Sequence, residues 1–169
     1  MESSAFEIAQ PQDIDAIMLV LEDAKKFMAL QRSGQWQDGH PRRERIIEDI
    51  RLGSYFVIKS NNIIVGGLAV LDYEADYEQL LEGKWLQDGP YLVIHRFAIF
   101  SSERGKGRAS FALKQVEIMA KKRNINAIRV DTHEKNKPMI NVLLKNGYLQ
   151  IGVVLLGNFK RRLAFEKRL

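Results

Sequence analysis

The chain has 169 residues, of which 46% are hydrophobic and 28% charged, and this predicts a single soluble globular domain over residues 1–169 with a buried core. The sequence holds no apolar run of about 18 residues, which argues against a membrane span, and its first residues lack the basic and apolar segments of a secretion signal. Cysteine is absent, which excludes disulfides and thiol catalysis and favours a cytoplasmic location. The net charge of +5 suits a phosphate-bearing partner, although solubility alone accounts for it equally well.

The first half of the chain combines helical and strand patterns. Apolar residues recur at helical spacing over roughly 12–29, and a second helix is expected between Pro41, which suits a first turn, and Gly53, which suits a helix end. The polar segment 72–89 carries aromatic residues and is expected to be an ordered loop. The expected strands, of which the last two form a hairpin, are Phe6–Ala9, Tyr55–Lys59 and Ile63–Leu71.

A strand–helix–strand unit dominates the second half. A strand is expected over Tyr91–Phe100, a helix over Ala109–Lys122 and a strand rich in β-branched residues over Ala127–Thr132. Such a unit predicts a parallel strand pair, because the connection between parallel strands is almost always a right-handed crossover. The remaining expected elements are a short helix capped by a glycine and two strands: Pro138–Asn146 with Gly147, Ile151–Leu156 and Arg162–Glu166.

The stretch SSERGKGRAS, residues 101–110, connects the strand and the helix of this unit. A helix N-terminus presents unpaired N–H groups and partial positive charge, which bind anions. Glycine lets the backbone approach a ligand closely, and basic side chains attract phosphate. The segment 104–109 is therefore expected to cradle a phosphate group, the alternative being a solvated basic turn. It matches neither the NTPase loop nor the dinucleotide fingerprint, since Ser110 stands at the third glycine of the latter.

The pattern R-x-x-G-x-A, formed by Arg104, Gly107 and Ala109, resembles the pyrophosphate-binding motif Q/R-x-x-G-x-G/A of the GNAT superfamily of acetyl-CoA-dependent N-acetyltransferases. The segment EKNKPMINVLLKNGY, residues 134–148, resembles the asparagine-led helix of that superfamily, which ends in glycine and an aromatic residue. The order of elements and the length also agree, so the resemblance covers nearly the whole chain. The segments QWQDGHP, YLVIHRFAI and RVDTHEKN resemble a bacterial subgroup of mostly unassigned substrate.

This resemblance implies an α/β (α+β) fold with a mixed central sheet of six to seven strands, largely antiparallel with a splayed parallel pair, flanked by about four helices. Acetyl-CoA, the cosubstrate, would lie in the splay without any metal. Its pantetheine arm would pair with the backbone of Phe97, Ala98 and Ile99 and approach Asn136, whose alternative role is to cap the following helix. Its pyrophosphate would bind the amides of Arg104, Gly105, Lys106, Gly107, Arg108 and Ala109.

The resemblance also implies acyl transfer, in which a neutral primary amine attacks the thioester directly in a ternary complex. A backbone N–H near Ala98 or Ile99 would polarise the thioester carbonyl, and a base or a water chain would accept the amine proton. The candidate bases are His95 and His133, each with a structural hydrogen-bonding role as its alternative. Some members of the superfamily carry a base carboxylate at the position of Val93, one step from His95 on the same strand face.

Strand alternation is expected to place Asp131 and His133 on one face, and to turn Arg96 away from His95 into a structural role. Many members of the superfamily have a tyrosine general acid seven residues after the asparagine. Leu143 stands at that position, so the leaving thiolate, whose conjugate thiol has a pKa of about 8.5, either needs no protein acid or is served by another group.

The acceptor site is expected to form from the first two helices and the segment 72–89. The acceptor would be a small-molecule amine or a peptide amine, and the fold would also allow a homodimer. Four aromatic residues are candidates for the walls of this site, with packing as their alternative role: Trp36, Tyr73, Tyr77 and Trp85. Four acidic residues are candidates for attracting the amine, with a solvated surface as the alternative: Asp38, Asp72, Glu74 and Asp76.

Two other functions fit part of the sequence. The basic and aromatic segment NFKRRLAFEKRL, residues 158–169, is typical of single-strand nucleic-acid binders, but its alternation favours an edge strand with basic gatekeepers, so nucleic acid is not the expected partner. A non-catalytic acyl-CoA-binding regulatory protein is the second alternative, because the tyrosine general acid is missing.

Overall fold

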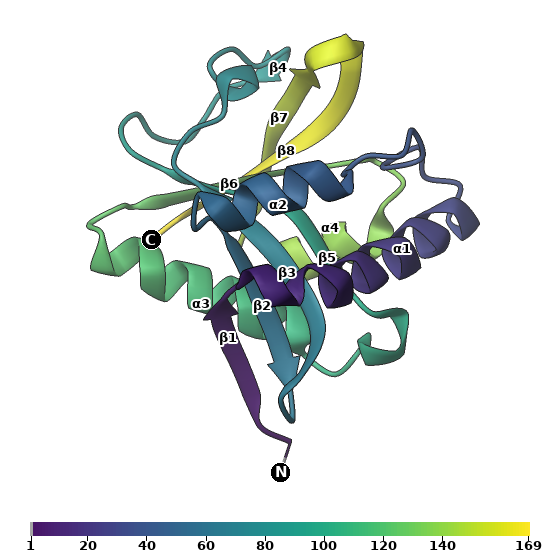
Figure 1. Ribbon diagram of the computed structural model, residues 1–169. Helices are drawn as coiled ribbons and strands as arrows, with labels where there is room; N and C mark the ends of the chain where they lie inside the picture. The colour runs from purple at the N-terminus through teal and green to yellow at the C-terminus, as the bar shows by residue number, and fades with distance from the viewer. Residues whose placement is uncertain (1) are drawn as a thin grey trace.

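The computed structural model describes residues 2–169, and within them helices and strands follow the mixed order expected from the sequence (Figure 1). The helices are α1 (Ile14–Leu30), α2 (Arg43–Arg51), α3 (Arg108–Lys122) and α4 (Lys137–Lys145). The strands are β1 (Ser4–Ile8), β2 (Tyr55–Ser60), β3 (Ile63–Leu71), β4 (Glu82–Gly83), β5 (Leu92–Ile99), β6 (Ala127–Thr132), β7 (Leu149–Leu156) and β8 (Lys160–Arg168).

The strands of the described residues form one sheet in the order β1-β2-β3-β5-β6-β8-β7-β4. Its pairs are antiparallel except for β5 and β6, which confirms a largely antiparallel sheet with one parallel pair. The predicted count of six to seven strands was one too low. The additional strand, β4, lies in the segment predicted to be a loop, where Glu82 pairs with Val153 and Gly83 with Gly152. Two residues are too few to show a strand period.

The parallel pair is short and then splays. β5 and β6 pair from Leu92 opposite Ile128 to Ile94 opposite Val130. β5 continues to Ile99 with β3 as its partner on the other side. The β5 backbone beyond Ile94 therefore has no strand partner on the edge that faces β6, which confirms the splay.

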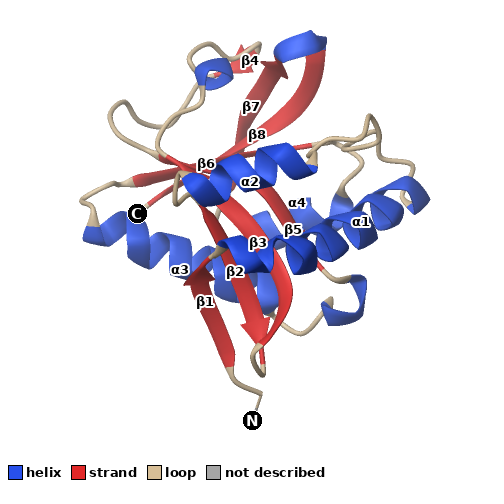
Figure 2. Ribbon diagram, in the orientation of Figure 1, coloured by secondary structure: helices blue, strands red, loops and turns tan. Residues whose placement is uncertain are grey.

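Two helices cover each face of the sheet: α1 and α2 lie on one face, and α3 and α4 on the other (Figure 2). Ile17 and Leu21 of α1 are buried against the first face, and Leu113 and Val116 of α3 against the second. Burial of each such side chain stabilises the fold by about 1.5–3 kcal/mol. Because this free energy favours burying the apolar stripe of a helix, the stripe in the sequence predicts which helix face contacts the sheet. No helix in the part of the chain described here is long and apolar enough to cross a membrane.

Two predictions, on the start of the second helix and on the place of the last strand, were wrong. The second helix begins at Arg43 with Arg42 as its N-cap, so Pro41 precedes it rather than forming its first turn. The C-terminal strand β8 is not an edge strand, because it pairs with β6 on one side and with β7 on the other. Its alternating charges therefore do not protect a free edge. Arg162 and Glu166, which alternate with apolar residues along β8, are buried instead.

Candidate active site

A cavity of about 230 Å³, here called the cofactor cavity, lies beside the free edge of β5. It runs past α1 at Phe27 to the loop that precedes α3. Nine of the ten residues predicted to bind acetyl-CoA line this cavity: Phe97, Ala98, Ile99, Arg104, Gly105, Gly107, Arg108, Ala109 and Asn136. The tenth, Lys106, does not line it and instead donates to Glu103 at 2.9 Å.

The loop before α3 has the backbone geometry of an anion cradle. Gly105 and Gly107 have φ values of 76° and 77°, in the left-handed region that favours glycine. A Cβ added at either glycine would meet no atom within 4 Å, so both face open space. Gly107 is the N-cap of α3 and supplies no side-chain cap, which leaves the first N–H groups of the helix available to a ligand.

The two arginines of this loop have different surroundings. Arg108 is buried and donates to Glu103, Ser4 and Ser60, so its side chain is structural. The guanidinium of Arg104 stacks on the Phe27 ring, 3.5 Å from the centroid. Among the described residues, its buried Nε atom has no hydrogen-bond partner. A buried donor without a partner, beside an open glycine cradle, fits a phosphate-bearing ligand.

Asn136 occupies the junction between the cofactor cavity and a second cavity. Its side chain caps α4 by accepting from the N–H of Met139 at 3.3 Å, and its Nδ2 donates to Gln35 at 3.2 Å. The helix-cap role considered for this residue is therefore present. The second cavity, here called the acceptor cavity, has a volume of about 350 Å³ and shares Phe97, Asn136 and Met139 with the first.

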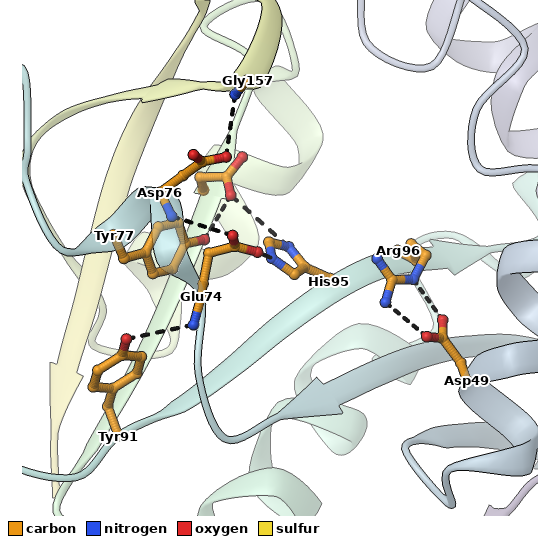
Figure 3. A network of polar contacts seen from close by, with 9 residues as sticks. Asp49, Glu74, Asp76, Tyr77, Tyr91, His95, Arg96 and Gly157 are labelled. Atoms are coloured by element: carbon orange, nitrogen blue, oxygen red, sulfur yellow. Dashed lines mark hydrogen bonds and ion pairs between the residues drawn. The ribbon is translucent and has the colours of Figure 1, made fainter.

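His95 lies in the acceptor cavity between two carboxylates (Figure 3). Its Nε2 atom is 2.6 Å from Oε2 of Glu74, and its Nδ1 is 3.9 Å from Oδ2 of Asp131. The hydroxyl of Tyr77 donates to the same Asp131 oxygen at 2.5 Å. The hydrogen bond with His95 is the main factor that lowers the pKa of Glu74, so this carboxyl is ionised at neutral pH.

A β-bulge brings His95 and Arg96 into the same cavity. Ala69 and Gly67 of β3 pair with His95 and Ala98 of β5, so two steps on β3 oppose three on β5. Arg96 takes the extra position with a φ of 54°. The prediction that alternation turns Arg96 away from His95 was wrong, because the bulge interrupts the alternation and both residues line the acceptor cavity.

Arg96 nevertheless has a structural partner. Its Nε and Nη2 atoms donate to the two oxygens of the buried Asp49 on α2, at 2.6 and 3.0 Å. This two-bond ion pair holds the bulge against α2 and so positions His95.

A family model described as "Acetyltransferase (GNAT) family" matches residues 20–148. The matched range includes the β5 residues that line both cavities, the loop 104–109 and Asn136. The chain belongs to the GNAT acetyltransferase family.

One solved GNAT structure agrees with this assignment over nearly the whole chain, and another acetyltransferase shares the fold. The acetyltransferase of the GNAT family from Streptococcus agalactiae 2603 is 38% identical, with a TM-score of 0.89, and the match covers 98% of this chain and 95% of that one. The PaiA N-acetyltransferase from Thermoplasma acidophilum, solved in complex with coenzyme A, is 13% identical with a TM-score of 0.76 over 99% of both chains, a likeness in fold. No curated protein matches the chain. As a GNAT member, the protein is an acyltransferase that uses acetyl-CoA.

The structure of this GNAT enzyme separates the two candidate histidines. His133 follows β6, does not line the acceptor cavity and faces a different one beside Arg161 and Arg162. Its Nδ1 accepts from the N–H of Lys135 at 3.1 Å, and burial followed by the charge of Arg162 lowers its pKa. Of the two candidates, His95 lines the acceptor cavity and His133 does not.

The four aromatic candidates also have different positions. Trp36 lines the acceptor cavity. Tyr77 is buried behind it, and Trp85 packs on the Tyr77 ring with centroids 5.2 Å apart. Tyr73 is exposed and bonds Glu78. Tyr77 and Trp85 thus support the wall of the cavity from behind.

Three of the four acidic candidates line the acceptor cavity: Asp38, Glu74 and Asp76. Asp72 lies on the surface and pairs with Arg123 at 3.2 Å. Sequence reasoning missed Gln35, whose Oε1 accepts from Asn136 and Thr132, and the cavity-lining Arg162. The period-two pattern of β8 puts Arg162 on the same face as the buried Ala164, and this pattern could have indicated that Arg162 points inward.

Proposed function

We propose that this enzyme transfers the acetyl group of acetyl-CoA to a primary amine by direct attack in a ternary complex, with His95 as the general base. The observation that carries the proposal is the pairing of His95 with Glu74 at 2.6 Å in a cavity that shares Phe97 with the cofactor cavity. A general base must lie within reach of the proton that it accepts, and this junction is where the amine and the thioester meet.

The hydrogen bond to Glu74 selects the tautomer of His95. The ionised Glu74 carboxylate can only accept, so the Nε2 atom of His95 carries the hydrogen and Nδ1 has the lone pair. Oδ2 of Asp131 lies 3.9 Å from that Nδ1 atom, which is too far for a direct hydrogen bond. The Nδ1 atom and the Asp131 carboxylate are therefore two neighbouring acceptors for an incoming ammonium group. Asp131 would hold the cationic amine while His95 takes its proton.

The chemical step then balances without a metal or a redox change. The ammonium first gives one proton to Nδ1 of His95, which releases it to solvent. The neutral amine nitrogen then forms a bond to the thioester carbonyl carbon, the carbon–sulfur bond breaks, and the second proton of the nitrogen passes to Nδ1. A backbone N–H near Ala98 or Ile99 on the free edge of β5 would stabilise the oxyanion. Much of the rate advantage would come from holding both reactants in adjoining cavities.

The departing thiolate needs no tyrosine in this scheme. Leu143, on α4, is fully buried in the core and lines neither cavity. A thiol pKa of about 8.5 makes thiolate a good leaving group near neutral pH, and the proton held by His95 is available to it afterwards.

Thiol release from acetyl-CoA tests this function with a panel of primary amines. The wild type should acetylate at least one amine, and His95→Gln should lower kcat by about 10²- to 10⁴-fold while the acetyl-CoA affinity measured by calorimetry stays unchanged. Acetyl-CoA binding without turnover of any amine would favour the alternative, a non-catalytic acyl-CoA-binding regulator. An unchanged kcat in the variant would remove His95 from the mechanism.

A further inference from the structure

The charged side chains around the acceptor cavity fall into paired and unpaired groups. Two of its cations have carboxylate partners, since Arg96 pairs with Asp49 and Lys160 with Asp38. Of the other two, Arg45 is exposed and has no ion pair within the described part of the chain, and the remaining cation is the buried Arg162. The structure gives it one hydrogen bond, from Nη1 to the backbone carbonyl of Arg161 at 2.9 Å, and no ion pair among the described residues.

Arg162 is also deeply buried, with 9% of its surface exposed. A guanidinium has five N–H donors in a planar fork that matches carboxylate and phosphate oxygens. Burying such a cation without an anion is costly, and this burial lowers the pKa of Arg162. A buried cation that lines a substrate cavity and has no protein anion in contact suits an anion brought by the substrate.

The sheet register places Arg162 near the groups that are proposed to receive the amine. Asp131 on β6 pairs with Ala164 on β8, and Arg162 is two residues from Ala164 on the same face. Diagonal neighbours on a sheet face lie about 7–8 Å apart, a span that a small zwitterion covers with hydrogen bonds of about 3 Å at both ends. The cavity thus has a carboxylate pole at Asp131, Glu74 and Asp76 and a guanidinium pole at Arg162.

We propose that the acceptor is a small amine that also carries an anionic group, a carboxylate or a phosphate ester, and that Arg162 binds that anion while the amine lies between His95 and Asp131. This specificity rests on the proposed acetyltransfer to amines. The acidic groups would attract any cation, whereas Arg162 would select the amines that have an anionic group at short distance.

Matched acceptors test the proposal. Acetylation rates are measured for free amino acids against the corresponding amino-acid amides, and for O-phosphoethanolamine against ethanolamine. In the wild type, kcat/KM for the anionic member of at least one pair should exceed that of its uncharged partner about 10- to 100-fold. Whether the amino acids or O-phosphoethanolamine show the preference identifies the anion. Equal rates within every pair would overturn the proposal.

Arg162→Gln should remove that preference, with little change for the uncharged partner and for acetyl-CoA affinity, and Arg162→Lys should restore part of it. Arg161→Gln is the control, because Arg161 is the adjacent residue, is exposed and pairs with Glu82 outside the cavity. A uniform loss for all acceptors in Arg162→Gln would show a structural role and overturn the proposal. Acetylation of uncharged amines without any anion preference would leave the proposed function standing, whereas no acetylation of any amine would overturn both.

Discussion

The Nε2 atom of His95 lies 2.6 Å from Oε2 of Glu74, across 21 residues of sequence, and the two side chains come from different elements. His95 stands on β5 beside the bulge, and Glu74 stands in the loop after β3, held by its own cap of the turn at Ala75–Tyr77. A loop residue thus bonds one ring nitrogen of a strand residue and leaves the other, Nδ1, toward Asp131. The consequences of this arrangement can be measured.

Glu74→Gln should lower kcat by about 10- to 100-fold, because the neutral amide no longer stabilises the imidazolium that forms when His95 accepts the proton. The affinity for acetyl-CoA should not change, since Glu74 does not line the cofactor cavity. Steady-state kinetics with the best amine and calorimetry with acetyl-CoA measure the two quantities. Glu78→Gln is the matched control, because this exposed glutamate on the same loop bonds only Tyr73. Equal losses in both variants would contradict the role of Glu74.

The same carboxyl predicts a pH dependence of stability. The pKa of Glu74 is lowered in the folded state, chiefly by its hydrogen bond to His95. Its contribution is therefore present above the unfolded value of about 4.3 and is lost as the pH falls through the folded pKa. Urea unfolding of wild type and Glu74→Gln should show a difference in free energy of unfolding at pH 7 that shrinks below about pH 4.3. A constant difference over this range would contradict the prediction.

Tyr77→Phe should reduce kcat without weakening acetyl-CoA binding. The Tyr77 hydroxyl donates to Asp131 at 2.5 Å, and burial raises the pKa of Tyr77 far above its ordinary value, so it remains a donor at any working pH. Its loss leaves a largely buried carboxylate short of a partner, at a cost of about 1–3 kcal/mol in unfolding free energy. Thermal or urea unfolding and amine kinetics measure both effects. Tyr73→Phe, on the exposed side of the same loop, should change neither.

Gly107→Glu should weaken acetyl-CoA binding at least 10-fold more than Gly107→Gln. Both side chains face open space, and both must adopt the φ of 77°, which costs about 1–2 kcal/mol. Only glutamate adds a negative charge beside the anion cradle at the start of α3. Calorimetric titration with acetyl-CoA compares the two variants at matched ionic strength. Equal affinities would show that the loop does not receive the pyrophosphate.

Leu143→Tyr should destabilise the protein by about 1–3 kcal/mol and should not raise kcat. Leu143 has no exposed surface and packs in the core that includes Ile140 and Tyr148, so a tyrosine there would overfill the core. Urea unfolding and kinetics measure the outcome. A higher kcat in a variant of normal stability would show that the tyrosine acid of other GNAT members can act from this position after all.

The amino-acid sequence by itself determined most of the elements of this protein and the place of the glycine loop between β5 and α3. Hydrophobic periods located α1, α3 and the strands β3, β5 and β6 within a few residues, because local packing against one sheet face leaves a pattern in the chain. The loop from Arg104 to Ala109 could be singled out as a candidate anion site for a similar reason, since a glycine-rich turn at a helix start acts through its own backbone, and the structure lines a cavity with it.

Only the tertiary structure decided which side chains meet. The bulge in β5 put Arg96 beside His95, although strand alternation predicted that they would part. Glu74 contacts His95, whereas His133 lines a different cavity. Arg162 is a buried cation on a strand that pairs on both sides, although the sequence predicted a basic gatekeeper on an edge strand. Contacts between residues far apart in sequence depend on strand order, register and loop path, and none of these leaves a periodic signal in the chain.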